Sequence, residues 1–202
     1  MLQRSDEWYA ARCGKATASN FRKILATIKS GEAADRRNYR AQLVCERLTG
    51  KVDQGFTNDA MRWGIENEPF ALAAYIAQTG VYVDEEGFIP HHTLLAGASP
   101  DGLIGLDGGI EIKCPTKAVH IETLRAQRMP AEHIPQVQGC MWISGREWWD
   151  FVSYHPEFPH GLQLFVTRVL RDDAYISTLE KSVEAFLNEV ATEVEELTAI
   201  AA

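Results

Sequence analysis

Apolar residues recur at spacings of three and four through the first third of the chain, which predicts amphipathic helices there. We expect helices over residues 7–12, from about Thr17, over residues 39–48 and over residues 58–78, the last interrupted or restarted at Pro69. Residues 25–37 are small and polar, so the pattern predicts a mobile basic loop before the third of these helices.

The spacing then changes. Glycine, proline and aspartate punctuate short apolar pieces, which predicts a meander of strands over residues 81–83, 87–89, 94–98, 102–106 and 109–113. A helix is expected over residues 133–143, and two further strands over residues 148–154 and 162–169.

The C-terminal part returns to helical spacing. One core-facing stripe is formed there by Val183, Phe186, Leu187, Val190, Val194 and Leu197. The order of elements predicts an α/β or α+β fold, with a central mixed sheet flanked by helices and a long C-terminal helix. We expect one domain over residues 1–202, with N-terminal helices to residue 78, the sheet and its helix over 79–170, and the last helix over 171–202.

Composition agrees with a globular chain. The 202 residues are 46% hydrophobic and 24% charged, with no apolar run near the ~20 residues of a membrane span and no secretory signal at the N-terminus. A cytoplasmic location is expected. The four cysteines lack any C-x-x-C pair and the six histidines are scattered, which favours buried thiols and surface imidazoles over a metal site.

Charge is unevenly distributed along the chain. The net charge is −8, yet residues 22–51 carry eight Lys or Arg against three Asp or Glu, and residues 179–202 carry six Glu against one Lys. A basic segment of this kind is either a solvated helix face or a nucleic-acid contact, and charge alone leaves both open.

Candidate chemistry lies in the predicted hairpin. Asp101 precedes one strand, and Glu111 and Lys113 lie two apart on the return strand, so they share a face while Ile110 and Ile112 point into the core. Two carboxylates and an ammonium suit a hard divalent ion such as Mg²⁺ and an attack on phosphorus. The plain alternative is an ordinary cross-strand ion pair, but a buried Glu and Lys need a partner or a metal.

Two neighbouring elements extend this cluster. Glu66 and Glu68 lie on the helix before the sheet, and Gln136 and Gln138 lie at the start of the helix after it. Residues two apart on a helix diverge by about 200°, so only one glutamine can face the hairpin.

The chain also carries W-x₃-R followed by T-A-S, W-G-x₃-E, S-P-D-G, E-x-K-C-P and Q-V-Q-x₂-M-W, between Trp8 and about Arg171. In this set it resembles the PD-(D/E)XK nucleases, and within them the group of bacteriophage lambda exonuclease and the YqaJ-like viral recombinases. The resemblance implies a Mg²⁺-dependent exonuclease with a restriction-endonuclease-like core. It would resect duplex DNA from the 5′ end, releasing 5′-mononucleotides and leaving 3′ overhangs for recombination by strand annealing.

The resemblance also implies roles for individual residues. The metal ligands would be Asp101, Glu111 and the Ile112 carbonyl, and the catalytic residues Lys113, Glu68 rather than Glu66, and Gln136 rather than Gln138. A terminal 5′-phosphate would be held by Arg12, Ser19 and Ser99. For Arg12 and Ser19 there is also a physical basis, since an arginine fork and a helix start both attract phosphate.

DNA contacts are expected outside the motifs. We expect non-specific contacts with the DNA backbone from Lys29, Arg36, Arg37 and Arg40. The path of the DNA would be lined by Lys117, Arg125 and Arg128. Met61 is either an apolar wedge at the strand fork or a core methionine. The acidic C-terminal helix is either solvated or packed between subunits.

Further expectations follow from the resemblance: Mn²⁺ also supports activity, Ca²⁺ inhibits it, the chain forms a homotrimer, and a single-strand annealing protein is its partner in a phage or prophage system. Three alternatives stay open here. They are an iron–sulfur nuclease, which lacks its cysteine cluster in this sequence, a non-catalytic DNA-end-binding module of the same fold, and an acidic structural protein.

Overall fold

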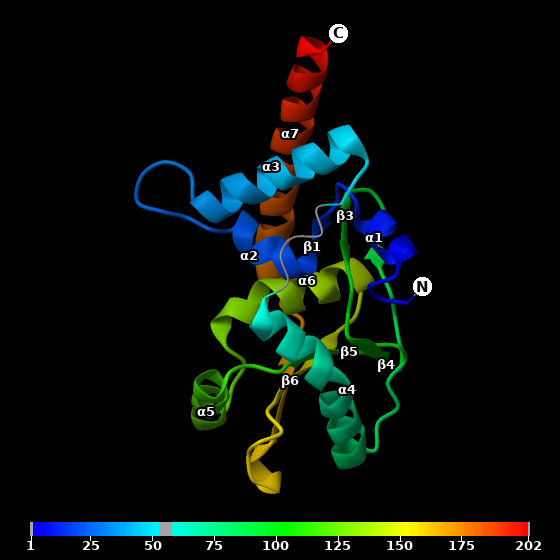
Figure 1. The fold of residues 1–202 in the computed structure, drawn as a ribbon, viewed down its shortest axis with the longest axis vertical. Helices are drawn as coiled ribbons and strands as arrows, with labels where there is room; N and C mark the ends of the chain where they lie inside the picture. Colours follow the sequence, from blue (N-terminus) through cyan, green and yellow to red (C-terminus); the bar gives the residue numbers. More distant parts are fainter. Residues whose placement is uncertain (1, 53–57, 202) are drawn as a thin grey trace.

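The computed structural model describes residues 2–52 and 58–201. Its helices are α1 (Asp6–Arg12), the 3₁₀ turn η1 (Ala18–Asn20), α2 (Phe21–Ile24), α3 (Ala34–Thr49), α4 (Asp59–Thr79), α5 (Lys117–Ala126), η2 (Ala131–His133), α6 (Ile134–Ser144), η3 (His160–Leu162) and α7 (Asp173–Ile200). Its strands are β1 (Ala16–Thr17), β2 (Ile89–Pro90), β3 (Ala96–Ala98), β4 (Gly102–Ile104), β5 (Gly108–Lys113), β6 (Trp148–Tyr154) and β7 (Leu164–Leu170) (Figure 1).

A four-stranded mixed sheet carries the central hairpin. Its order is β4-β5-β6-β7, with β5 parallel to β6 and antiparallel to β4. Strand β5 is therefore interior, and all of its residues are buried except Lys113 at its end. The helix α4 packs on this sheet on the side of Ile110 and Ile112, which belong to a core cluster with Ala71 and Tyr75.

A second, three-stranded sheet has the order β1-β3-β2. The predicted meander is wrong here, because β3 pairs with β2 on one side and with β1 on the other, and none of the three joins the larger sheet. Residues 81–83 form no strand, and only Asp84 makes an isolated bridge to Leu103. Strand β1, two residues long, is too short to show an alternating pattern in sequence.

Three helical predictions need correction. The helix α4 runs through Pro69 without interruption, since Ile65 and Pro69 are both exposed and water can bind the carbonyl that proline leaves without a donor. The helix α3 begins at Ala34, inside the segment predicted as a loop. The helix α5 was not predicted at all.

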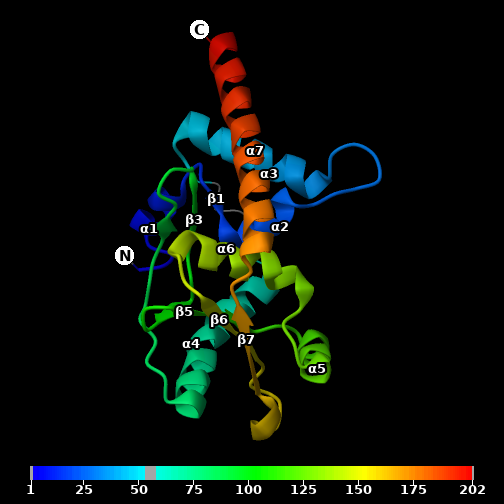
Figure 2. The same cartoon turned by 180° about the vertical axis from the view of Figure 1, so that it is seen from behind.

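The long helix α7 crosses α3 and extends past it to the C-terminus (Figures 1 and 2). Its predicted stripe is confirmed at four positions, with Val183, Phe186, Leu187 and Val190 buried, while Val194 is half-buried and Leu197 is exposed. The stripe packs in the main core with Tyr39 and Leu43 of α3.

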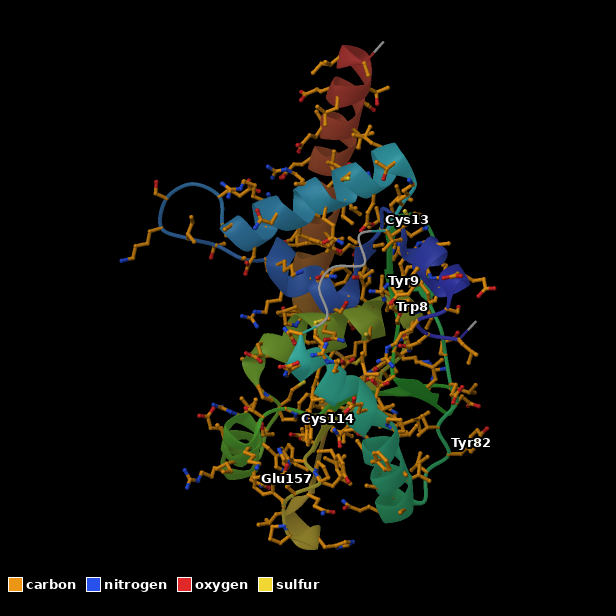
Figure 3. All side chains as sticks on the ribbon, viewed as in Figure 1. Trp8, Tyr9, Cys13, Tyr82, Cys114 and Glu157 are labelled. Atoms are coloured by element: carbon orange, nitrogen blue, oxygen red, sulfur yellow. The ribbon has the colours of Figure 1, made fainter. Side chains whose placement is uncertain are left out.

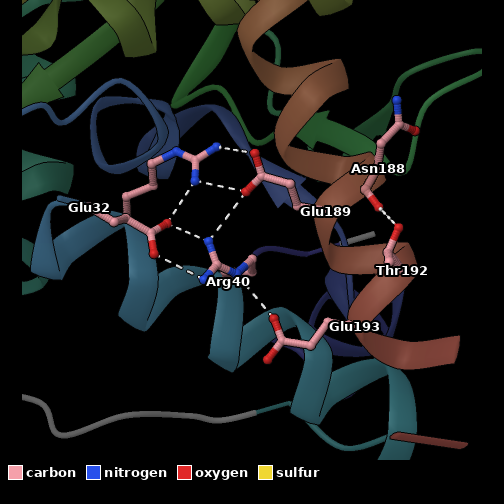
Figure 4. Close-up of polar contacts among 7 residues, drawn as sticks. Glu32, Arg40, Asn188, Glu189, Thr192 and Glu193 are labelled. Atoms are coloured by element: carbon pink, nitrogen blue, oxygen red, sulfur yellow. Dashed lines mark hydrogen bonds and ion pairs between the residues drawn. The ribbon is translucent and has the colours of Figure 1, made fainter. Parts of the chain in front are cut away.

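Ion pairs join the two helices beside this core. Arg36 and Arg40 of α3 contact Glu32, Glu189 and Glu193, and Figure 4 shows this network across the α3–α7 crossing. Carboxylates of α7 are thus partners of the basic segment, so the acidic C-terminal helix is not merely solvated along this face.

Gly109 permits close packing between β5 and β6. The register places Gly109 beside Trp149 in the parallel pair. A Cβ on Gly109 would lie 2.3 Å from the Trp149 ring, which is fully buried. Any larger residue at position 109 would therefore displace the ring or the strand.

The cysteine and histidine predictions hold only in part. Cys140 is buried, but Cys45 is exposed, and all four thiols are free. The prediction of surface imidazoles is wrong for His91, His120 and His155, which are buried. His120 is held there by Ser153 Oγ and the Leu162 carbonyl, each 2.8 Å from a ring nitrogen. No helix in the described part of the chain is long and apolar enough to cross a membrane.

Candidate active site

One cavity of about 1270 Å³ gathers the elements described above. Its lining includes Trp8 on α1, Cys114 after β5 and Glu157 after β6, which are labelled in Figure 3. Its lining includes nine of the sequence-predicted functional residues that the resemblance assigns to the active site and the phosphate pocket: Arg12, Ser19, Glu68, Ser99, Asp101, Glu111, Ile112, Lys113 and Gln136.

The hairpin brings its charged residues together as predicted. Asp101 lies in the bend before β4, and its Oδ2 accepts a hydrogen bond from the Ile112 backbone N–H across the hairpin at 2.6 Å. The Lys113 ammonium lies 2.5 Å from Glu111 Oε1. Glu111 is 1% exposed and the Lys113 side chain 31%, so the lysine is the more accessible member of this pair.

Only one glutamine of α6 faces this cluster, as the helical spacing predicts. Gln136 Nε2 donates to Glu111 Oε1 at 2.6 Å, and its Oε1 accepts from Lys113 Nζ at 3.3 Å. Gln138 points away, donating to the Leu170 carbonyl and accepting from the Asp172 N–H at the start of α7. Gln136 therefore bridges the Glu111 carboxylate and the Lys113 ammonium, while Gln138 connects α6 to β7 and α7.

The two glutamates of α4 lie differently with respect to the cavity. Glu68 lines the cavity and Glu66 is exposed outside that lining. Glu68 pairs with Arg4 at 2.9 Å. Arg4 and Gln3 also line the cavity, and Gln3 donates to the Pro100 carbonyl at 2.6 Å, directly before Asp101. Sequence reasoning missed both, because no periodic or motif signal marks the first five residues.

The electrostatics of the cluster are those of crowded carboxylates. Burial, followed by the neighbouring charge of Glu111, raises the pKa of Asp101 well above its ordinary value. Burial alone lowers the pKa of Lys113, but the carboxylates of Glu111 and Asp101 outweigh it and the pKa rises above the usual range. Lys113 is therefore a cation here. Burial and then Glu68 raise the pKa of the Cys114 thiol to about 12, which excludes it as a thiolate nucleophile at neutral pH.

The donor set fits a hard divalent ion. Glu111 Oε2 is buried and has no hydrogen-bond partner in the described residues, an arrangement that is costly unless a cation is bound. Within residues 2–52 and 58–201, no three His, Cys, Asp or Glu side chains converge as a complete metal site. Asp101 and Glu111 would thus supply part of the coordination, and Mg²⁺ commonly takes one or two carboxylates with water and phosphate oxygens.

A second subsite lies at the α1 side of the cavity. The Arg12 guanidinium donates to Ser99 Oγ at 2.9 Å, and Ser99 directly precedes Pro100 and Asp101. Burial lowers the pKa of Arg12, and no described carboxylate lies within 4 Å of it. Ser19 lines the same cavity in η1, with its hydroxyl 3.3 Å from that of Thr17. A half-buried arginine without an acidic partner is a site for an anion.

The predicted DNA contacts are distributed differently. Arg36 and Arg40 pair with Glu32, Glu189 and Glu193 in this structure. Lys117 lines the cavity and pairs with Glu157 at 2.5 Å. Four of the predicted DNA-contact residues are exposed and do not line the cavity: Lys29, Arg37, Arg125 and Arg128.

Met61 lies at the cavity rim and is 51% exposed. The prediction of Met61 as a core methionine is therefore wrong.

Trp8, whose indole N–H donates to Ser99 Oγ at 3.0 Å, was noted only as part of a motif. Its contact crosses 91 positions in sequence, and only the fold could bring the two side chains together.

Comparison with known proteins identifies close relatives. The sequence model of the YqaJ-like viral recombinase domain matches residues 7–147. Two solved structures, LHK-Exo in complex with dAMP and the alkaline exonuclease LHK-Exo from Laribacter hongkongensis, are 47% identical over 98% of both chains, with TM-scores of 0.91 and 0.89. A phage-related exonuclease from Haemophilus somnus 129PT shares the fold, with a TM-score of 0.71 and 14% identity over 91% of this chain and 96% of that one. No curated protein matches the chain.

Proposed function

We propose that this chain, which belongs to the YqaJ-like viral recombinase family, is a divalent-metal-dependent exonuclease that digests one strand of duplex DNA from its 5′ end. The family and the similarity to alkaline exonucleases support a nuclease. The polarity, the metal and the products are the finer part of the proposal.

One observation carries it. A buried carboxylate oxygen of Glu111 without a hydrogen-bond partner lies in the same cavity as Arg12, a cation without an acidic partner. A phosphodiester end bound with a divalent cation would complement both, since the cation meets the carboxylates and the terminal phosphate meets the guanidinium.

The roles of the residues follow from their contacts. Asp101 and Glu111 would hold Mg²⁺, with the Ile112 carbonyl as a further oxygen, and the ion would supply Lewis acidity toward the phosphate and the water. Lys113 is a cation beside Glu111 and can stabilise charge that develops on the phosphoryl oxygens. Gln136 contacts both Glu111 and Lys113 and can hold them in place. Glu68 lines the same cavity and can orient a water there.

The phosphate pocket supports 5′-to-3′ digestion. If Arg12, Ser19 and Ser99 hold a terminal 5′-phosphate, the next phosphodiester lies toward the carboxylates, and its cleavage releases a 5′-mononucleotide. The relative described in complex with dAMP, a 5′-mononucleotide, agrees with such a product. Water attack with departure of the 3′ oxygen leaves a new 5′-phosphate, so the cycle can repeat and a 3′ overhang remains.

Further parts of the proposal concern conditions and partners. Mg²⁺ is the proposed cofactor, with Mn²⁺ also supporting activity and Ca²⁺ inhibiting it, because carboxylate sites bind Ca²⁺ in looser geometry. A homotrimer, a single-strand annealing partner and a phage or prophage origin in the bacterial cytoplasm complete it. These rest on the family and not on any contact in this chain.

The decisive experiment compares the parent with Lys113→Ala on duplex DNA labelled at either end, with Mg²⁺ and with a chelator. We expect the parent to shorten the strand from its 5′ end only with Mg²⁺, and Lys113→Ala to lose at least a hundredfold in rate while still binding DNA, since the ammonium acts on the transition state. Binding without shortening in the parent would instead favour a non-catalytic DNA-end-binding module.

The same assay tests end recognition with duplexes that carry a 5′-phosphate or a 5′-hydroxyl. The parent is expected to prefer the phosphate, and Arg12→Ala to lose that preference more than it loses affinity for long duplex, which dispersed basic residues maintain. Arg37→Ala, an exposed arginine outside the cavity lining, is the matched control and should keep the preference. Equal rates on both ends in the parent would remove the phosphate pocket from the proposal.

A further inference from the structure

Trp8 makes two contacts with the phosphate subsite from one side chain. Its indole N–H donates to Ser99 Oγ at 3.0 Å, and its ring lies under the Arg12 guanidinium at 3.9 Å from the ring centroid. Arg12 itself donates to the same Ser99 oxygen at 2.9 Å. Three residues that the chain separates by up to 91 positions thus form one closed set of contacts.

The hydrogen bonds fix the direction of the Ser99 hydroxyl proton. A serine oxygen has two lone pairs and one proton. Arg12 and Trp8 are donors only, so they occupy both lone pairs of Ser99 Oγ. The Ser99 O–H is left to point in the remaining tetrahedral direction, and in the described chain no acceptor receives it. Ser99 is therefore held as a donor.

The ring contact restrains the second group. Arg12 has five N–H donors in one plane, and stacking on an aromatic face fixes the orientation of that plane. With no described carboxylate to hold it, the guanidinium depends on Trp8 and Ser99 for its position. An arginine oriented before the ligand arrives loses less freedom when it binds.

A packing role alone does not explain this side chain. The helix α1 contributes no fully buried residue, and Trp8 itself is half-buried at the cavity wall. Its indole nitrogen reaches the hydroxyl of Ser99 rather than a backbone carbonyl or solvent. The contacts of Trp8 thus converge on Ser99 and Arg12, two of the residues that the proposed function assigns to a terminal phosphate.

We propose that Trp8 is a positioning residue that sets the specificity of this subsite for a terminal phosphate monoester, by holding Ser99 as a donor and Arg12 in plane. This rests on the proposed function, since it assumes that the subsite binds a 5′-phosphate. Trp8 acts through Ser99 and Arg12, and a bridging diester or a 5′-hydroxyl, with fewer free oxygens, gains less from the arrangement.

The test measures binding of dAMP and of deoxyadenosine to the full chain by calorimetry with Ca²⁺ present. Trp8→Phe keeps an aromatic face for Arg12 and removes only the N–H donor. We expect it to weaken dAMP about threefold to tenfold, the usual effect of one lost hydrogen bond, and to leave deoxyadenosine unchanged. In a Ser99→Ala background the same change is expected to have no further effect, because Trp8 acts through that hydroxyl.

Controls separate this role from folding. Trp148→Phe is the matched control, since Trp148 also stacks on an arginine, Arg168, at 3.5 Å but lies outside the cavity lining. It should leave the preference for dAMP intact. If Trp8→Phe does not fold, a benzothienyl-alanine at position 8, in which sulfur replaces the indole N–H, removes the donor with almost no change in shape.

The outcomes distinguish the two proposals. A parent that binds dAMP and deoxyadenosine equally would overturn the phosphate subsite itself. A parent that prefers dAMP, with Trp8→Phe showing the same preference, would overturn only the role of Trp8. Equal weakening of both ligands, or an undiminished effect of Trp8→Phe in the Ser99→Ala background, would make Trp8 a structural residue.

Discussion

Replacement of Gln136 by leucine is expected to separate catalysis from stability within one helix. The variant removes the hydrogen bond from Gln136 Nε2 to Glu111 Oε1, 2.6 Å long, and the weaker contact with Lys113 at 3.3 Å. Hydrogen bonds to charged groups are worth about 1.5–3 kcal/mol. If the loss appears in the transition state, the rate falls about tenfold to hundredfold, at ~1.4 kcal/mol for each factor of ten.

Gln138→Leu is the matched control, two residues further along α6. It removes a 2.9 Å hydrogen bond to the Leu170 carbonyl and a 3.0 Å bond from the Asp172 N–H, neither of which touches the cavity. Leaving two partly buried backbone groups without partners costs about 1–3 kcal/mol, which lowers Tm by roughly 2–10 °C in a chain of this length. Cleavage below the unfolding transition is expected to stay within twofold of the parent.

The assay pairs initial digestion rates on 5′-phosphorylated duplex with thermal unfolding of the same samples. Gln136→Leu is expected to lose rate at temperatures where it stays folded, and Gln138→Leu to lose Tm and keep rate. A Gln136→Leu protein that digests DNA at the parent rate, or a folded Gln138→Leu protein that does not digest it, would refute the assignment of the two glutamines.

Two further predictions concern stability. Gly109→Ala would place a methyl group 2.3 Å from the Trp149 ring and is expected to lower the free energy of unfolding by about 1–3 kcal/mol, seen as a lower Tm. Gly161→Ala is the control, since a Cβ there would meet no heavy atom within 4 Å, and it should lower Tm far less. Equal Tm values for the two variants would contradict the packing argument. In the α3–α7 network, hydrogen bonds from Arg40 and from Arg36 lower the pKa of Glu32 and of Glu189, respectively, so their contribution is full above the unfolded pKa near 4.5 and is lost as the pH falls through the lowered values. Arg36→Gln is therefore expected to lower Tm at pH 7 by an amount that corresponds to about 1 kcal/mol or less. The difference from the parent should shrink below about pH 4 and in high salt. A difference that does not depend on pH or salt would show that the ion pairs are not its cause.

Much of the local structure could be predicted because its signals are local. The strand β6 follows from a short run rich in aromatic residues, and the stripe of α7 follows from helical period. The shared face of Glu111 and Lys113 follows from two-residue alternation in β5. The divergence of Gln136 from Gln138 follows from helix geometry in the same way. None of these needs knowledge of what lies across the fold.

The errors occur where the local signal is weak or a distant partner decides. Strand β1 exists because it pairs with β3, some 80 residues later. Arg36 and Arg40 carry no local sign of their partners, and only the crossing of α3 by α7 gives them the carboxylates of Glu189 and Glu193. His120 and His155 read as surface imidazoles, because burial depends on which segments cover them.

The sequence by itself determined the order of most elements, the hairpin with its two carboxylates and lysine, and the family, since these depend on near neighbours and on motif spacing. The tertiary structure alone decided that Gln136 reaches Glu111, that Arg4 pairs with Glu68, and that Trp8 reaches Ser99. The physical reason is the distance in sequence over which each kind of information acts. Backbone period orients a side chain relative to its own element, whereas contacts between elements depend on how the core packs them together.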